Sequence, residues 1–201
     1  MRSLIAALVL FTMVLPAFGG TYPVGEEAHT FDRHRATVGF GGGYGKISID
    51  EAGVFSETSS TPDDFSMGMA FAFDYAYRLN PNVAIGGFAT AWMGALDGDL
   101  GNEDWIVSTF GGSFWFRPAG EGFYLKGGFG ACTVLATIDD PKSEEPLEDY
   151  SDYGFGAVGA VGYDITISPN FAAGPRLEFQ AMDVGGGVTA VSSTLLFTFT
   201  F

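Results

Sequence analysis

Strict alternation of side-chain character marks the segment Phe65–Leu79 as a β-strand. Its odd-numbered positions are apolar: Phe65, Met67, Met69, Phe71, Phe73, Tyr75, Tyr77 and Leu79. Its even-numbered positions are small or polar: Ser66, Gly68, Ala70, Ala72, Asp74, Ala76 and Arg78. Successive side chains of a strand point to opposite faces, so one face is apolar and the other is small with two charges. This pattern is typical of a membrane β-barrel strand whose apolar face points outward.

The last stretch, Val191–Phe201, alternates in the same way and ends on an aromatic residue. One face carries Val191, Ser193, Leu195, Phe197, Phe199 and Phe201. The other face carries Ser192, Thr194, Leu196, Thr198 and Thr200. Because a terminal strand needs a backbone partner, we expect it to pair with the first strand near Val38–Tyr44 and leave no open edge.

Six further segments read as strands, although their patterns are looser. They are Ala36–Ile49, Val83–Leu96, Ile106–Phe116, Phe123–Ile138, Tyr153–Ile165 and Phe171–Ala181. The segment Val83–Leu96 is ambiguous, and Gly86-Gly87 within it suggests a register shift through a β-bulge. The count predicts an all-β fold, an eight-stranded antiparallel up-and-down transmembrane β-barrel.

Short and long connections alternate between these segments. The short turns are Asn80–Asn82, Pro118–Gly122 and Ser168–Asn170, which are rich in Pro, Asn and Gly. The expected longer loops are Asp50–Asp64, Asp97–Asp104 and Asp139–Asp152, with a shorter one near Asp183–Gly187. Short turns at one end and longer loops at the other predict a periplasmic and an extracellular end, respectively.

Charge follows the same division. The net charge is −15, and 17 of the 24 acidic residues fall in the expected loops, where Lys142 is the only base. Four arginines lie toward the opposite end: Arg33, Arg35, Arg78 and Arg117. The acidic balance argues against nucleic acid or an anionic lipid surface as an electrostatic partner of the chain as a whole.

The N-terminus has the features of a secretory signal peptide. Met1–Ser3 is positively charged, Leu4–Pro16 is apolar, and Ala17-Phe18-Gly19 is a small-x-small cleavage site. A buried N-terminal helix is the alternative, but nothing polar patterns or caps this stretch. We therefore expect residues 1–19 to be cleaved, 20–33 to form a pre-barrel periplasmic segment, and 34–201 to form the barrel. Cys132, the single cysteine, allows no intramolecular disulfide and reads as a small core residue.

The chain resembles the small outer-membrane barrels of the OmpA and OmpX type, the outer-membrane β-barrel domain. The resemblance rests on the signal peptide, on Gly162–Phe171 followed by Leu177–Phe179, and on the terminal Phe197–Phe201. It covers the whole mature chain and implies residence in the cell outer membrane, with the lipid bilayer and lipopolysaccharide as surroundings. It also implies delivery by the outer-membrane assembly machinery through the C-terminal strand. Leu196 departs from the family pattern, which has Gly there, so this recognition rests on Phe199 and Phe201.

Charged residues on the expected inward faces are candidates for the lumen. They are Asp74, Arg78, Lys126, Asp164, Arg176 and Glu178. In the family such residues form ion pairs that plug a narrow lumen, and charges facing lipid would be costly. The alternative is a gated pore with Arg176 and Glu178 as its constriction. We expect the plugged lumen, because a barrel of this size is just wide enough to be filled by side chains.

The acidic loops offer hard oxygen ligands to divalent cations. The weak candidates are Asp63, Asp64, Asp97, Asp99, Asp139 and Asp140. None matches a defined calcium loop, so a solvated, repulsive surface is the favoured interpretation. The alternative hypothesis is that cations bridge these loops to anionic surface sugars or partners.

An enzyme and a soluble carrier are the other function classes. The histidines, His29 and His34, precede the first expected strand, and Ser192 and Ser193 lack a neighbouring base. A soluble lipocalin-like barrel would hold its apolar face inside, and its exterior would then be mostly alanine and glycine. The sequence therefore predicts a non-enzymatic outer-membrane barrel without a cofactor, in a structural or surface-interaction role. A narrow pore for small solutes or cations is the second candidate.

Overall fold

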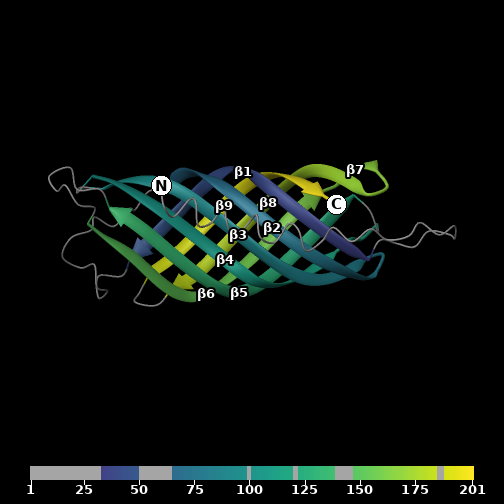
Figure 1. The fold of residues 1–201 in the computed structure, drawn as a ribbon, viewed down its shortest axis with the longest axis horizontal. Coiled ribbons are helices and arrows are strands. Elements are labelled where there is room, and N and C mark those ends of the chain that lie inside the picture. The colour runs from purple at the N-terminus through teal and green to yellow at the C-terminus, as the bar shows by residue number, and fades with distance from the viewer. Residues whose placement is uncertain (1–32, 50–64, 99–100, 120–121, 139–146, 185–187) are drawn as a thin grey trace. The chain divides into compact units, whose positions relative to one another are not determined.

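The computed structural model describes residues 33–49, 65–98, 101–119, 122–138, 147–184 and 188–201. The chain divides into two units, Met1–Thr30 and Phe31–Phe201, and all described residues lie in the second. This unit is built from antiparallel strands that run obliquely around a common axis (Figure 1). Among the described residues, no helix is long and apolar enough to cross a membrane.

The described residues form nine strand segments. They are β1 (His34–Ile49), β2 (Ser66–Asn80), β3 (Val83–Gly98), β4 (Gly101–Phe116), β5 (Phe123–Ile138), β6 (Leu147–Tyr163), β7 (Ile165–Ser168), β8 (Phe171–Val184) and β9 (Val188–Thr200). The short β7 continues β6 beyond Asp164, and both pair with β8, so β6 and β7 together act as one wall strand. The result is a closed, eight-stranded antiparallel barrel, which confirms the predicted fold class.

Closure between the two ends of the barrel sequence follows the expected register. β9 pairs antiparallel with β1, and Val38 lies opposite Phe199. The backbone N–H of Ala36 donates to the Phe201 carbonyl at 3.1 Å, and the N–H of Phe201 donates back to the Ala36 carbonyl at 2.9 Å. The predicted partnership of the terminal strand with Val38–Tyr44 is thus confirmed, and the seam is hydrogen-bonded to the last residue.

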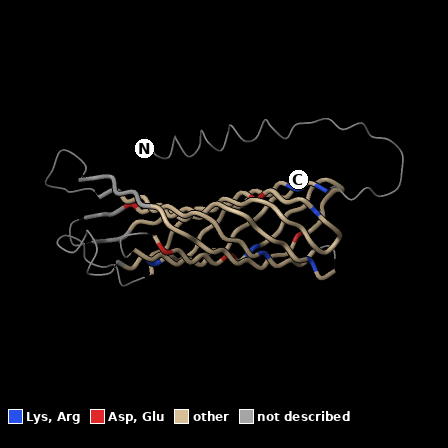
Figure 2. The backbone as a smooth tube through the Cα atoms, turned by 90° about the horizontal axis from the view of Figure 1, so that it is seen from below, with Lys and Arg blue, Asp and Glu red and all other residues tan. Residues whose placement is uncertain are grey.

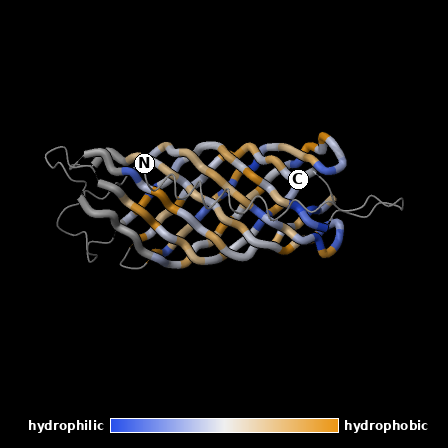
Figure 3. The backbone as a smooth tube through the Cα atoms, viewed as in Figure 1, coloured by the Kyte–Doolittle hydropathy of each residue, from blue (hydrophilic) through white to orange (hydrophobic). Residues whose placement is uncertain are grey.

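The two faces of β2 are those predicted from its alternation. Ala70, Ala72, Asp74, Ala76 and Arg78 are buried inside the barrel. On the outer wall of the same strand the side chains are large and apolar, with exposed fractions of 60% for Phe65, 72% for Met67 and 59% for Met69. Exposed large apolar side chains also recur on the outer faces of the other strands, and hydrophobic residues are spread along the length of the barrel (Figure 3). An apolar wall around a closed barrel suits a lipid environment.

The short turns are where the sequence places them, and two of the longer loops are shorter than predicted. The turns after β2, β4 and β7 lie at one end, here called the turn end, and the opposite end is the loop end. In the region predicted as the loop Asp97–Asp104, Asp97 pairs with Asn102 and Gly98 with Gly101, so β3 and β4 continue as a hairpin. Likewise β6 already begins at Leu147. Acidic residues do not end a strand whose backbone can still pair with its neighbour.

Two further expectations need correction. The bulge at Gly86-Gly87 is wrong, because the β2–β3 and β3–β4 registers run through both glycines without a shift. The irregularity lies instead between Arg78 and Asn80, beside the turn. His34 does not precede the first strand but is the first residue of β1, opposite Tyr77.

Candidate functional site

The middle of the lumen holds four charged side chains from three strands. Asp74 comes from β2, Lys126 from β5, and Arg176 and Glu178 from β8. All four lie on the inward faces of their strands, and their side chains are at most 1% exposed. The strand period thus forces charges that cannot face lipid cheaply into a shared interior.

These side chains form a ring in which each cation contacts both anions. Lys126 Nζ lies 2.6 Å from Asp74 Oδ1 and 3.3 Å from Glu178 Oε2. Arg176 Nη1 lies 2.5 Å from Asp74 Oδ2, and its Nη2 lies 3.3 Å from Glu178 Oε2. We call this group the central ring. Its formal charges cancel, which is the condition under which burial of ions is tolerable.

Polar and aromatic neighbours complete the environment of the central ring. The Thr90 hydroxyl donates to Glu178 Oε1 at 2.6 Å, and the Gln180 side-chain amide donates to Thr90 Oγ1 at 3.0 Å. Lys126 Nζ also lies 4.8 Å from the centre of the Phe88 ring and 5.6 Å from that of Trp115. Cation–π contacts of this kind are strongest in desolvated sites. These contacts hold the four charged side chains in positions where each cation lies next to both anions.

A second charged group lies near the turn end. Arg117 Nη2 lies 2.8 Å from Asp164 Oδ2, and Arg35 Nη1 lies 3.5 Å from the same oxygen. The guanidinium of Arg117 stacks over Tyr124 at 4.7 Å from the ring centre. Asp164 is held at the break between β6 and β7, where its N–H donates to the Gly122 carbonyl at 3.0 Å. Several Lys and Arg residues lie toward this end of the barrel (Figure 2).

Five of the six predicted lumen residues belong to the two groups described above. Asp74, Lys126, Arg176 and Glu178 form the central ring, whereas Asp164 joins Arg35 and Arg117 nearer the turn end. Arg78 is buried on the turn-end part of β2, where its backbone N–H donates to the Arg33 carbonyl at 2.7 Å. Cross-strand partners, rather than the i, i+4 neighbour on β2, make the ion pairs of Asp74 described above.

The loop-end half of the lumen is filled by apolar side chains. We call this group the loop-end core; its members are Ile47, Trp92, Trp105, Val107, Cys132, Val134, Ala136, Met182, Val184, Val188 and Ala190. Each is at most 4% exposed. Water that crossed the barrel would have to pass this apolar layer.

Trp92 is one of the two tryptophans of the loop-end core, and three glycines make room for its indole ring. A Cβ at Gly45 of β1 would lie 2.7 Å from the indole ring, and one at Gly94 of β3 would lie 2.4 Å from it. A Cβ at Gly68 of β2 would lie 2.6 Å from the indole nitrogen. We call these three residues the glycine cradle. The sequence analysis missed the cradle, although single glycines facing inward on neighbouring strands were its signal.

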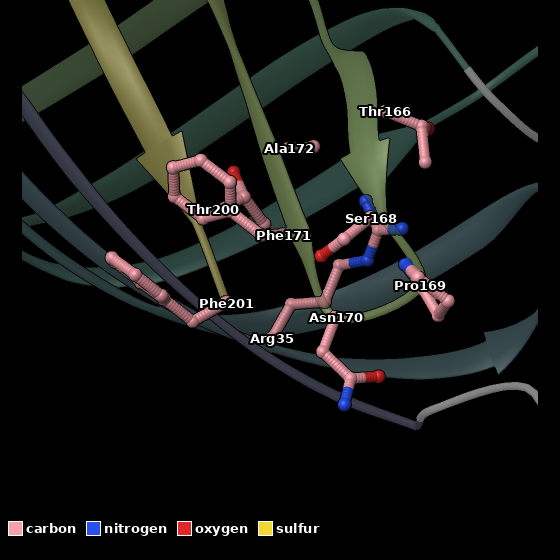
Figure 4. Close-up of a pocket in the computed structure, with 9 residues that line it drawn as sticks. All are labelled: Arg35, Thr166, Ser168, Pro169, Asn170, Phe171, Ala172, Thr200 and Phe201. Atoms are coloured by element: carbon pink, nitrogen blue, oxygen red, sulfur yellow. The ribbon is translucent and has the colours of Figure 1, made fainter.

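Two hollows lie at the surface of the barrel. A small one of about 30 Å³ at the turn end is lined by Arg35, Ser168, Asn170 and Phe201 among others, and has room for about two waters (Figure 4). A wider groove of about 460 Å³ runs along the outer wall over Gly112 and Gly127, beside Phe114 and Phe129. The groove opens toward the surroundings of the barrel rather than into the lumen.

The remaining sequence candidates lie mostly beyond the described part. Asp63, Asp64, Asp99, Asp139 and Asp140 and the side chain of Asp97 are outside the described residues, as is His29. Within the described residues, no group of three or more His, Cys, Asp or Glu side chains could hold a metal ion. Ser192 is buried in the lumen, whereas its neighbour Ser193 belongs to the outward face of β9.

The barrel has the fold of small bacterial outer-membrane β-barrels. It is similar to Ail, the attachment invasion locus protein of Yersinia pestis, solved with the heparin analogue sucrose octasulfate: TM-score 0.59, 15% identity, 84% of this chain and 99% of that chain. It is also similar to Neisserial surface protein A, with a TM-score of 0.57 and 13% identity over 84% of this chain and 96% of that one. No protein-family model matches the sequence, and no curated protein does.

Proposed function

We propose that this chain is an integral protein of a bacterial outer membrane with a non-enzymatic, structural or surface-interaction role. Its loop end faces the outside and its turn end faces the periplasm. The observation that carries the proposal is the filled lumen, in which the central ring and the loop-end core occupy successive levels of the barrel. A barrel whose interior is occupied leaves its outer wall and its loops as the surfaces available to partners.

Planar-bilayer recordings test the filled lumen against the second candidate, a narrow pore. We expect no steady single-channel openings from the purified protein, because the apolar loop-end core excludes a continuous column of water. The pore would have Arg176 and Glu178 at its constriction. Steady conductance that disappears in Glu178→Gln would contradict the structural role and establish the pore.

The orientation is tested by labelling intact cells with a membrane-impermeant maleimide. In a Cys132→Ser background, Asp104→Cys places a thiol at an exposed loop-end position, and Asn80→Cys places one at an exposed turn-end position. We expect labelling of the first variant only, and of both after the outer membrane is permeabilised. Labelling of the Asn80→Cys variant alone on intact cells would reverse the proposed topology.

The acidic loops are proposed to meet cations or cationic partners. Ail was solved with a polyanionic heparin analogue, whereas a net charge of −15 disfavours such a ligand for the present chain. Divalent cations at Asp63, Asp64, Asp97, Asp99, Asp139 and Asp140 would bridge the loops to lipopolysaccharide. Calorimetry with Ca²⁺ and Mg²⁺ that detects no binding in the millimolar range or tighter would remove this part of the proposal.

The ends of the chain carry proposed roles in delivery. Residues 1–19 act as the cleaved signal peptide, residues 20–33 as a periplasmic segment, and residues 34–201 as the barrel. The outer-membrane assembly machinery recognises the terminal strand through Phe199 and Phe201. Intact-mass measurement of protein purified from membranes tests the first point, with Gly20 as the expected N-terminus.

A further inference from the structure

The outer wall near the turn end carries a polar group that the lumen does not explain. Arg33 and His34 stand at the start of β1, and Tyr75 and Tyr77 stand on the adjoining part of β2. We call these four residues the rim cluster. Arg33 and His34 are exposed, and the two tyrosines are half-buried.

Contacts between side chains fix the geometry of the rim cluster. Arg33 Nη1 donates to the Tyr77 hydroxyl at 3.1 Å, and the His34 Nδ1 and Tyr75 hydroxyl oxygen lie 2.5 Å apart. The His34 ring packs edge-on against Tyr77, with 5.1 Å between ring centres, and lies 5.9 Å from the Tyr75 ring. Donors that are already held in place lose less conformational entropy when a ligand binds.

The position of the rim cluster along the barrel points to the head-group level of a membrane. Tyr75 and Tyr77 follow Phe71 and Phe73 in the outward column of β2, and the turn at Pro81 comes four residues after Tyr77. Apolar rings therefore give way to rings with polar tips where the wall approaches the turn. Tyrosines with this placement mark the membrane–water interface in barrels.

The charge of the rim cluster indicates which chemical group of a lipid head group it would bind. Arg33 immediately precedes β1, and its guanidinium reaches the hydroxyl of the outward Tyr77 at the turn end. Among the described residues, the basic side chain on an outward strand position is Lys46, at the loop end. A guanidinium offers phosphate a planar fork of N–H donors. The hydroxyl and imidazole groups beside it supply further donors at neighbouring positions.

We propose that the rim cluster binds the phosphodiester of an anionic phospholipid in the leaflet at the turn end. Arg33 contacts the phosphate oxygens, Tyr77 positions Arg33, and the acyl chains lie along the apolar wall below. The proposal rests on the membrane placement proposed above, and it assigns to one place on the wall a preference that the apolar surface alone does not provide.

Native mass spectrometry of the full-length mature barrel in detergent tests this site. The probes are phosphatidylglycerol and, as a phosphate-free control, diacylglycerol with the same acyl chains. We expect one tightly retained phosphatidylglycerol, and a loss of about tenfold in its affinity in Arg33→Gln, since a charge-assisted hydrogen bond contributes about that factor. Tyr77→Phe should produce a smaller loss, because the guanidinium remains but is no longer positioned.

The matched control is Lys46→Gln, which removes an outward charge at the opposite end of the same strand. It should retain phosphatidylglycerol like the unaltered barrel. Equal losses in Arg33→Gln and Lys46→Gln would show attraction by charge alone, and unchanged retention in Arg33→Gln and Tyr77→Phe would show aromatic anchoring alone; either result overturns the proposal. Heat-modifiable gel mobility reports folding of each variant. A folded, membrane-inserted barrel without lipid preference would leave the proposed function intact while removing this site.

Discussion

The middle of the lumen and its loop-end part are filled by opposite kinds of side chain. In the middle, the central ring places two cations and two anions in mutual contact. Toward the loop end, the loop-end core places apolar side chains around Trp92 and Trp105. Apolar packing requires only shape complementarity, whereas buried ions require every partner to be present. In the loop-end core a substitution should therefore weaken packing by degrees. The central ring, in contrast, depends on all four charged side chains.

Removing one member of the central ring should have the largest effect on stability, because its partners stay buried. Arg176→Ala leaves Asp74 and Glu178 each with Lys126 alone, in a site that excludes water. We expect a loss of about 3–5 kcal/mol in the free energy of unfolding. Urea unfolding in lipid vesicles measures it.

The control for this variant is Arg33→Ala, which removes an exposed arginine and should cost at most about 1 kcal/mol. The double variant Asp74→Leu with Arg176→Met retains the Lys126–Glu178 pair, which is itself neutral. We expect it to be more stable than Arg176→Ala alone. If Arg176→Ala costs no more than its control, water solvates the ring and the lumen is not filled at this level.

Trp92→Ala makes the corresponding test of the loop-end core. The indole is 1% exposed, and its removal leaves a cavity that the rigid barrel wall cannot close. We expect a loss of about 3 kcal/mol in the same unfolding measurement. Phe129→Ala is the control on the outer wall, where lipid or detergent fills the vacated space, and it should cost less. Equal losses from both variants would contradict a packed core.

Gly45→Ala tests the glycine cradle by filling the space that this glycine leaves for the Trp92 ring. The added methyl group would meet the Trp92 ring at 2.7 Å, so we expect a loss of about 1–3 kcal/mol in the free energy of unfolding. In a Trp92→Ala background the same substitution should cost much less, because the group it collides with is gone. Gly159→Ala is the matched control, since a Cβ there has no neighbour within 4 Å. Additive costs in the double variant would show that the cradle and the indole are independent.

Cys132→Ser is the mildest change and tests how apolar the loop-end core is. The thiol lies 3.9 Å from the Asp183 carbonyl oxygen, and a serine hydroxyl could donate to the same acceptor. We expect a loss of about 1 kcal/mol, which unfolding in vesicles measures against Ser193→Ala on the outward face of β9. A stabilised variant would indicate that water already reaches this level of the lumen.

The sequence predicted the strand face of a side chain better than it predicted which side chains it contacts. Alternation within Phe65–Leu79 is a local property, so it identified inward Asp74 without knowledge of any other strand. The partners Lys126 and Arg176 depend on the stagger of β5 and β8 around the barrel, which no short pattern encodes. Asp74 was therefore placed correctly inside, while its contacts came only from the structure.

The sequence correctly predicted Cys132 as a small core residue, but it missed the rest of the loop-end core for a related reason. In Val83–Leu96 both faces carry apolar residues, with Ile85 outward and Trp92 inward, so the alternation that identifies a membrane strand is absent. The same ambiguity suggested a bulge at Gly86-Gly87 that the register does not contain. The loop Asp97–Asp104 was overestimated because polarity was taken as the end of a strand, although backbone pairing is indifferent to side-chain charge.

The seam between Ala36 and Phe201 imposes an order of events on folding. The residues that close the cylinder stand at opposite ends of the barrel sequence, and the Thr37 and Thr200 hydroxyls meet at 3.0 Å across it. Joining so long a loop costs little more entropy than joining a shorter one. Timing is the greater constraint, because an unfinished chain has two unpaired edges exposed to every other chain nearby. Such a protein must be kept from pairing with other copies until β9 pairs with β1, because only then are both strand edges covered.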